Sequence, residues 1–233
     1  MAENSCFWAK KGCVGRVNFN LYHYAGNSPV KYTDPDGREI NWVKGDGVSD
    51  EDFKRVQQEA DKLSASNTIA GKRFSFLASE TEFDVTINVE IQGNSSAQPV
   101  FDEDACNGIG SSSNVYINLT NENKKADGVK MSLGEILAHE VSGHAYEINK
   151  GRFHLSSPKF SKFMKESVLR GLDEQVAVAM QNEYRCHLGL KGQRKKYRGF
   201  QNTWNMPIYN PKTATWSIKD QFTKKMETWR LPK

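Results

Sequence analysis

Two histidines and a glutamate near the middle of the chain have the chemistry of a metal-dependent hydrolase. His139, Glu140 and His144 lie in the stretch LGEILAHEVSGHAY, where the turn before His139 is apolar and the neighbours of His144, Gly143 and Ala145, are small. Imidazole nitrogens bind zinc, and a glutamate beside a ligand can act as general base towards a metal-bound water. The alternative is a helix with a buried histidine pair and no metal.

The spacing of the two histidines is unusual for a helix that chelates one ion. In a regular α-helix, residues i and i+4 lie about 40° apart around the axis, whereas i and i+5 lie about 140° apart. His139 and His144 have the wider spacing. A π-bulge absorbs one residue and restores a shared face. We therefore expect the helix to depart from α-hydrogen bonding between the histidines, with Gly143 permitting the departure because it has no Cβ.

The segment resembles the H-E-x-x-H motif of zincin metallopeptidases with one residue inserted. The same H-E-x-x-G-H arrangement occurs in the dipeptidyl peptidase III family, where it binds zinc. The resemblance implies a Zn²⁺ site with His139 and His144 as ligands and Glu140 as general base. The third histidine of the metzincins has no counterpart, because position 150 is Lys.

A third protein ligand is required, because a catalytic zinc usually has three and keeps one position open. The helical sequence LDEQVAV at 172–178 follows the histidines by about thirty residues. It resembles the acidic helix that supplies the third ligand in gluzincins. This resemblance favours Glu174, with Asp173 and His154 as alternatives. Glu183 lies nine residues after Glu174, about 180° around the helix, so the two cannot both face one metal.

The resemblance implies hydrolysis of a peptide bond. Zn²⁺ would polarise the scissile carbonyl and lower the pKa of its bound water from about 16 towards 7. Glu140 would take the proton of that water and pass it to the leaving amine. The oxyanion needs a further donor. Four side chains are candidates that the sequence does not separate: Tyr184, Arg185, Tyr197 and His154.

Residues 15–38 resemble the end of an Rhs/YD-repeat core. They contain LYHY, NSPV and YTDPDG, and in that family N-x-Y-x-Y, N-N-P and D-P-x-G elements close the shell before a variable C-terminal toxin. Residues 131–199 also resemble Rhs-associated metallopeptidase toxins. The resemblance implies a toxin or effector that is secreted or delivered to a target cell within a larger polypeptide. Its partners would be a protein or peptide substrate, the N-terminal Rhs shell and a cognate immunity protein.

The elements that must position these residues indicate an α+β fold. Strict alternation predicts strands at 83–91 and 114–119, and the second strand could bind an extended substrate by β-addition. Helices are expected at 50–63, at 132–149 and from 158 to about 187, the second with a capping box formed by its first residue and a glutamate three residues later.

We expect two parts in the chain, a junction segment at 1–40 and a zincin-like domain at 41–233. In the second, a small mixed or antiparallel sheet would pack on the helices that carry the site. The polar segments 94–110 and 121–128 are expected to be loops, and the last forty residues to be mostly irregular.

Length, composition and charge narrow the classes of function. The 233 residues suit one domain with an appendage, and the formal net charge of +4 gives no reason to expect nucleic acid. No apolar run is long enough to cross a bilayer. The N-terminal sequence MAENSCFWAKKG lacks the apolar core of a secretory signal, so delivery would use another route.

Two other classes of function stay open from the sequence. A nuclease of the same delivery system would use the basic run KGQRKKYR at 191–198 to contact phosphate, although such a run is usually a solvated surface. A metal-free interaction module would need none of the proposed ligands. Zinc content near one equivalent would separate the peptidase from the interaction module.

Overall fold

The computed structural model describes residues 40–154, 166–198, 203–219 and 225–229. The Rhs-like motifs at 15–38 lie outside the described residues, so the junction segment and the division of the chain near residue 40 stay predictions. The expected start of a helix at residue 158 also lies outside them.

The central sheet has four strands in the order β1-β2-β4-β3. The strands β1 (Asn41–Lys44), β2 (Val85–Glu90) and β4 (Ser113–Asn118) are parallel to one another, and β3 (Ser96–Pro99) runs antiparallel to β4 at one edge. The sheet is therefore mixed, with β4 enclosed between two neighbours.

The two strands predicted from alternating sequence form the middle of this sheet. β2 pairs with β4 along its full length, with Ile87 beside Val115 and Val89 beside Ile117. All four side chains are buried, whereas the intervening residues of both strands are mostly part-exposed. Such a pattern belongs to a sheet that packs its apolar face on a core and leaves the other face to solvent.

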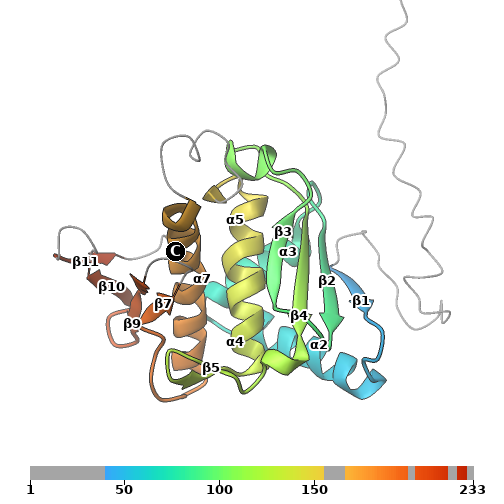
Figure 1. Cartoon of the computed structure of the whole chain (residues 1–233), viewed down its shortest axis with the longest axis horizontal. Helices are drawn as coiled ribbons and strands as arrows, with labels where there is room; N and C mark the ends of the chain where they lie inside the picture. Colours follow the sequence, from blue (N-terminus) through green and yellow to red (C-terminus); the bar gives the residue numbers. More distant parts are fainter. Residues whose placement is uncertain (1–39, 155–165, 199–202, 220–224, 230–233) are drawn as a thin grey trace, which may run out of the picture. The chain divides into compact units, whose positions relative to one another are not determined.

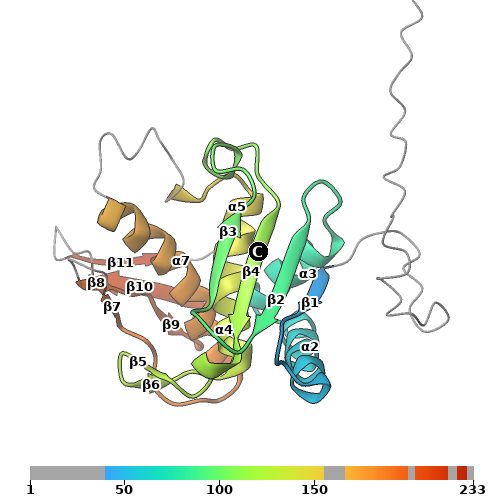
Figure 2. The same cartoon turned by 45° about the vertical axis from the view of Figure 1, so that its right-hand side comes forward.

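Helices cover the apolar face of the sheet. Figure 1 shows the helical segment around the candidate site lying between the long C-terminal helix and the sheet, and both of these layers contact it. Figure 2 shows the first two helices beside β1 and β2. The helices are α2 (Asp50–Ser64), α3 (Ile69–Ser79), α4 (Leu133–Leu137), the π-helix η3 (Ala138–Ala145), α5 (Tyr146–Asn149) and α7 (Glu166–His187).

The predicted capping box begins the helical segment that carries the histidines. The Ser132 hydroxyl accepts from the backbone N–H of Glu135, and a carboxylate oxygen of Glu135 accepts in turn from the backbone N–H of Ser132. Reciprocal bonds of this kind satisfy two donors that a helix start otherwise leaves open. The start of α4 is thus fixed by local sequence, as expected.

The end of the chain contains more strands than the sequence predicted. β7 (Lys196–Arg198) pairs with β8 (Thr203–Asn205), and β10 (Thr215–Lys219) pairs with β9 (Ile208–Asn210) and β11 (Met226–Trp229). The expectation of a mostly irregular end is therefore wrong for the part of this segment that the structure describes. These strands have three to five residues, and they form because they pack on α7: the buried Trp216 donates its indole N–H to the Ala179 carbonyl at 3.2 Å.

The two segments expected to be loops also contain short elements. β3 and the 3₁₀ turn η1 (Asp104–Cys106) lie within 94–110, and the hairpin of β5 (Lys125–Ala126) and β6 (Val129–Lys130) lies within 121–128 and just beyond it. The α+β class is as predicted, with a small mixed sheet packed on helices. Within the described ranges, no helix is both long and apolar enough to span a membrane.

Candidate metal centre

The two histidines lie on a π-helix. The turns on either side, α4 and α5, are α-helical, but residues Ala138–Ala145 between them have π-helical hydrogen bonding. The rings of His139 and His144 consequently lie side by side, with centroids 5.0 Å apart and planes at 84°. The predicted departure from α-helical bonding is confirmed, and it brings residues five apart onto one face.

Gly143 is needed for a reason other than the one expected. A Cβ at this position would lie 2.5 Å from the Cα of Ala177 and 2.8 Å from its Cβ. Gly143 is not among the glycines with positive φ. Because Ala177 lies on α7 only three residues after Glu174, the absent Cβ lets η3 approach the helix that carries the acid.

Glu174 completes a group of three potential ligands. Its carboxylate oxygens lie 3.4 Å from Nε2 of His139 and 3.8 Å from Nε2 of His144. One ligand atom from each of these residues lies within 4.8 Å of the others. Two ligand atoms that are each about 2.05 Å from a tetrahedral ion are separated by about 3.3 Å. His139, His144 and Glu174 could therefore hold a metal ion.

Several buried polar atoms around this group lack a hydrogen-bond partner among the described residues. They are Nδ1 of His139, Oε2 of Glu140, Oε2 of Glu174 and both amide atoms of Gln181. Buried polar atoms are nearly always hydrogen-bonded, and Gln181 lies seven residues after Glu174, on the same face of α7. A metal ion with water would satisfy the carboxylate oxygens, so the donor set fits a metal.

The charges of the group are strongly coupled. Burial alone would lower the pKa of His144, but the Glu174 carboxylate and the nearby Glu140 and Asp173 raise it to about 9. Burial would raise the pKa of Glu174, but the two imidazoles hold that pKa well below its usual range. The carboxylate of Glu174 therefore stays ionised beside the two imidazoles. A carboxylate must be ionised to bind a cation.

Glu140 lies in the same buried region but is not part of the ligand group. Only 7% of its surface is exposed. Burial raises the pKa of Glu140, against the lowering effect of the charges of His139 and His144. A carboxylate with a raised pKa is a stronger base than an ordinary one, and this property suits proton transfer from water.

The two alternative third ligands bind each other instead. Nδ1 of His154 lies 2.9 Å from Oδ1 of Asp173, and the backbone N–H of His154 donates to the same oxygen at 3.1 Å. Neither residue belongs to the group that could hold a metal. The geometry therefore favours Glu174, and it places Asp173 where it fixes the chain after α5 against α7.

Tyr184 and Arg185, expected as candidate oxyanion donors, have partners away from the metal group. The Arg185 guanidinium binds the buried carboxylate of Glu135 at 2.8 and 2.9 Å. The buried Tyr184 ring stacks on His187 and packs against Gly134. Both residues lie ten or eleven positions after Glu174, about 15 Å along α7. They hold α7 against α4, and a catalytic role for them stays a prediction that these contacts do not support.

Glu183 faces away from the metal group, as its spacing predicts. Its two carboxylate oxygens accept from the backbone N–H groups of Ile69 and Ala70 at 2.9 and 3.1 Å. These N–H groups belong to the first turn of α3, where helix donors have no intrahelical partner. Glu183 therefore caps a helix that the sequence did not predict.

Tyr197 stays a candidate donor to the oxyanion, and Arg194 becomes a second candidate. Tyr197 packs against a cluster that includes Val178, one turn after Glu174 on α7. The Arg194 guanidinium lies over the Tyr197 ring at 5.2 Å, and its charge reaches Glu140, whose pKa it lowers. The sequence showed Arg194 only as one member of a basic run, because nothing local separates it from the exposed Lys195 and Lys196.

Comparisons with known proteins found no match. No protein-family model, curated protein or solved structure matches the chain. The assignment of a function therefore depends on the chemistry of the residues that the fold brings together.

Proposed function

We propose that this chain is a zinc-dependent metallopeptidase. The observation that carries the proposal is the π-helix, which places His139 and His144 on one face, opposite Glu174 and next to the buried Glu140. A helix that only buried a histidine pair would have no reason to adopt this rare bonding pattern, which occurs frequently at functional sites.

The donor set supports zinc rather than a harder cation. Two imidazole nitrogens and one carboxylate leave a fourth position open on a tetrahedral ion, which is the arrangement of catalytic zinc sites. Calcium and magnesium prefer six or more oxygen ligands, and the described group offers only one carboxylate. When bound, zinc supplies Lewis acidity towards a carbonyl oxygen and towards water.

Glu140 performs the proton transfers in the proposed reaction. Its carboxylate accepts a proton from the attacking water, and its burial and raised pKa favour that step. The same carboxyl group then gives the proton to the leaving amine. His139, His144 and Glu174 keep their positions as ligands throughout, held by the contact of η3 with α7 at Gly143.

An extended peptide would bind at β3 rather than at β4. The segment 114–119, expected to receive a substrate strand, forms β4, which pairs with β2 on one side and β3 on the other. A strand enclosed in this way has no free backbone groups for β-addition. β3 is the edge strand beside η3, and it ends at Pro99, a residue that sheets accept at edges. We place the substrate along β3.

The resemblance of residues 15–38 to an Rhs core supports a wider role. On that basis, the peptidase domain acts as the C-terminal toxin or effector of an Rhs-type polypeptide delivered to a target cell. A cognate immunity protein would be its natural inhibitor.

The test combines metal content with activity. We expect the purified chain to bind about one zinc and to cleave unfolded protein, measured by metal analysis and by release of new amino termini. Glu140→Gln should lower the cleavage rate by about 10²- to 10⁴-fold, as for loss of a general base, and should retain zinc. Near-normal turnover in Glu140→Gln would refute the mechanism. Hydrolysis of DNA or RNA by a zinc-free sample would favour the nuclease instead.

A further inference from the structure

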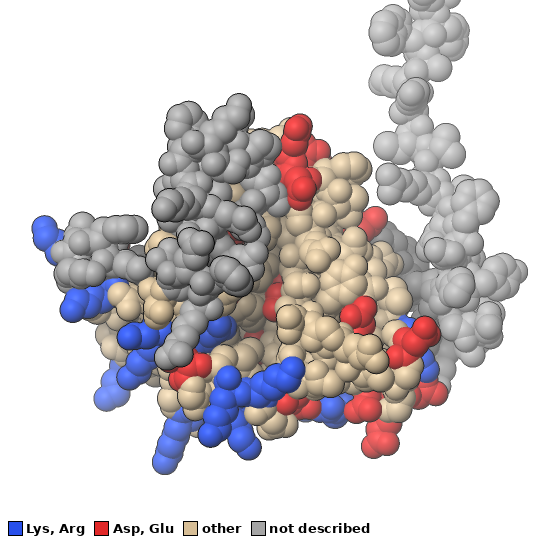
Figure 3. Space-filling view, in the orientation of Figure 1, with Lys and Arg blue, Asp and Glu red and all other residues tan. Residues whose placement is uncertain are grey.

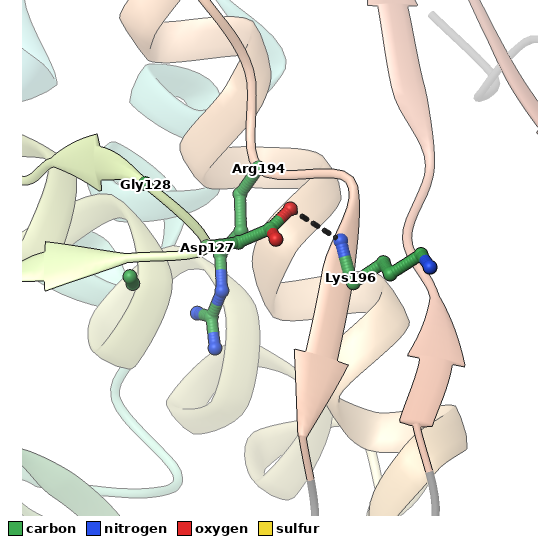
Figure 4. Close-up of a pocket in the computed structure, with 5 residues that line it drawn as sticks. Asp127, Gly128, Arg194 and Lys196 are labelled. Atoms are coloured by element: carbon green, nitrogen blue, oxygen red, sulfur yellow. Dashed lines mark hydrogen bonds between the residues drawn. The ribbon is translucent and has the colours of Figure 1, made fainter.

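A polar pocket opens beside the strand that follows α7. It has a volume of about 420 Å³ and is lined by Ala126, Asp127, Gly128, Arg194 and Lys196. Figure 4 shows the Arg194 side chain beside Asp127 at the turn of the β5–β6 hairpin, whereas the Lys196 side chain points away from that hairpin. Figure 3 shows many Lys and Arg side chains on the same side of the molecule. The surroundings therefore favour an anionic ligand.

Asp127, the acidic residue in this pocket, already accepts hydrogen bonds from the backbone. Oδ2 of Asp127 accepts from the backbone N–H groups of Lys195 and Lys196 at 2.9 and 3.0 Å, the second of which is drawn in Figure 4. Asp127 therefore anchors the segment that leads from Arg194 into β7 and forms no ion pair with the Arg194 guanidinium.

Buried contacts fix the position of Arg194. The backbone N–H of Arg194 donates to Oδ1 of Asn182 at 2.9 Å, and its carbonyl accepts from Nδ2 of the same residue at 2.9 Å. Asn182 is fully buried on α7, eight residues after Glu174 and about 80° from it around that helix. The guanidinium rests on Tyr197, which packs against Val178, one turn from Glu174. Arg194 is thus held against the part of α7 that follows the metal ligand.

The guanidinium has an unsatisfied donor. Nε of Arg194 is buried and has no hydrogen-bond partner among the described residues, and no carboxylate within those residues forms an ion pair with Arg194. Arg185, by contrast, satisfies its guanidinium fully with Glu135 and backbone carbonyls. A buried donor without an acceptor is unfavourable, and the fork of a guanidinium matches a carboxylate with two parallel hydrogen bonds.

We propose that Arg194 is a specificity-determining residue that binds a carboxylate of the peptide substrate in this pocket. The carboxylate belongs to an acidic side chain or to the C-terminus of the peptide, close to the scissile bond. This inference rests on the proposed peptidase function, because that function brings a peptide to the metal centre, where the charge of Arg194 acts on Glu140.

Cleavage of a random peptide library tests the proposal. Cleavage sites are read by mass spectrometry for the wild type and for Arg194→Met, with free-acid and amidated versions of the library. We expect the wild type to prefer a carboxylate at one position by about 10- to 100-fold, the range of hydrogen bonds to a charged group, and Arg194→Met to lose that preference. Loss confined to the free-acid library would assign the carboxylate to the C-terminus, and loss in both would assign it to a side chain.

Two control variants accompany this measurement. Lys195→Met removes a neighbouring exposed charge outside the pocket and should keep the preference, whereas Arg194→Lys should keep only part of it. An unchanged preference in Arg194→Met would overturn the proposal. A uniform fall in rate without a change in preference would also overturn it, because Arg194 would then act on the oxyanion.

A binding measurement separates failure of this inference from failure of the peptidase proposal. Peptide pools that differ only in Glu or Gln are bound to Glu140→Gln and to the Glu140→Gln, Arg194→Met double variant. Tighter retention of the Glu pool that depends on Arg194 would support the carboxylate site even if the wild type cleaved nothing. Equal retention of both pools by the two proteins would refute it, whatever the wild type cleaves.

Discussion

Asp173 and Glu174 are adjacent in sequence, yet their carboxylates have different partners. Asp173 holds His154, while Glu174 lies between His139 and His144. Glu183, on the same helix, caps α3. Each of these acids contacts a different part of the fold, so their substitutions should give separable effects on metal affinity and on stability.

The first prediction concerns the third ligand. Glu174→Ala should lower zinc affinity by more than the roughly 10- to 100-fold typical of an outer partner of a ligand, because it removes a direct donor. The matched variant Glu183→Ala should bind zinc normally and lose about 1 kcal/mol of unfolding free energy, as for a lost helix cap. Zinc titration and urea unfolding of both variants provide the measurements.

A specific pair of results would contradict this assignment. If Glu174→Ala kept one tightly bound zinc while Asp173→Ala or His154→Ala lost it, the third ligand would be the residue whose substitution removed the metal.

At the scale of elements, the contact between η3 and α7 decides whether the ligands meet. There is no space for a Cβ at position 143, because backbone and side-chain atoms of Ala177 on α7 lie where it would be. The backbone carbonyl of Ser142, within the π-helix, accepts from Arg73 at 3.2 Å. The two helices are thus packed at a distance that a single added methyl group would increase.

Gly143→Ala tests this contact. The added Cβ must displace α7 or η3, so we expect a loss of about 1 to 3 kcal/mol in unfolding free energy, as for overpacking, together with weaker zinc binding. Ser142→Ala is the control, since it alters the preceding buried residue and removes only a hydroxyl that has no partner among the described residues. Wild-type zinc affinity in Gly143→Ala would show that the close approach is not required.

The buried pair of Glu135 and Arg185 joins α4 to the far end of α7. The side chains are 0% and 8% exposed, so removal of one partner leaves an uncompensated charge. Arg185→Met should therefore cost about 3 to 5 kcal/mol in unfolding free energy, while peptide cleavage per folded molecule should be unchanged. If the variant had normal stability but greatly reduced turnover, Arg185 would have a catalytic role instead.

At the scale of the whole molecule, the metal should join separate parts of the chain. His139 and His144 come from η3 and Glu174 comes from α7, so only the folded chain brings the three together. A ligand that binds the folded state alone stabilises it by about 4 kcal/mol at a concentration of 1,000 times Kd.

Removal of the metal with a chelator tests whether the bound metal stabilises the folded chain. Addition of a chelator should lower Tm by several degrees, since about 1 kcal/mol corresponds to roughly 2 to 4 °C in a domain of this size. His139→Ala, which lacks a ligand, should show no change in Tm on chelation. An equal response in His139→Ala would mean that the stabilising ion binds elsewhere.

The sequence by itself determined the features that depend on near neighbours. The H-E-x-x-G-H spacing required a helix with an altered period, and η3 has one. The Ser132 cap and the alternation of β2 and β4 followed equally from local pattern. Each of these features is fixed by residues a few positions apart, through helix geometry, capping or strand periodicity.

Only the tertiary structure decided which distant residues serve the site. Arg185 shares a face with Glu174, yet its distance along α7 and its ion pair with Glu135 keep it away from the metal group. Arg194 gains its position from Asn182, a contact that no local pattern encodes. Short strands such as β3 form because neighbours supply their hydrogen bonds. Side-chain partners depend on packing between elements far apart in sequence, and that packing exists only in the folded chain.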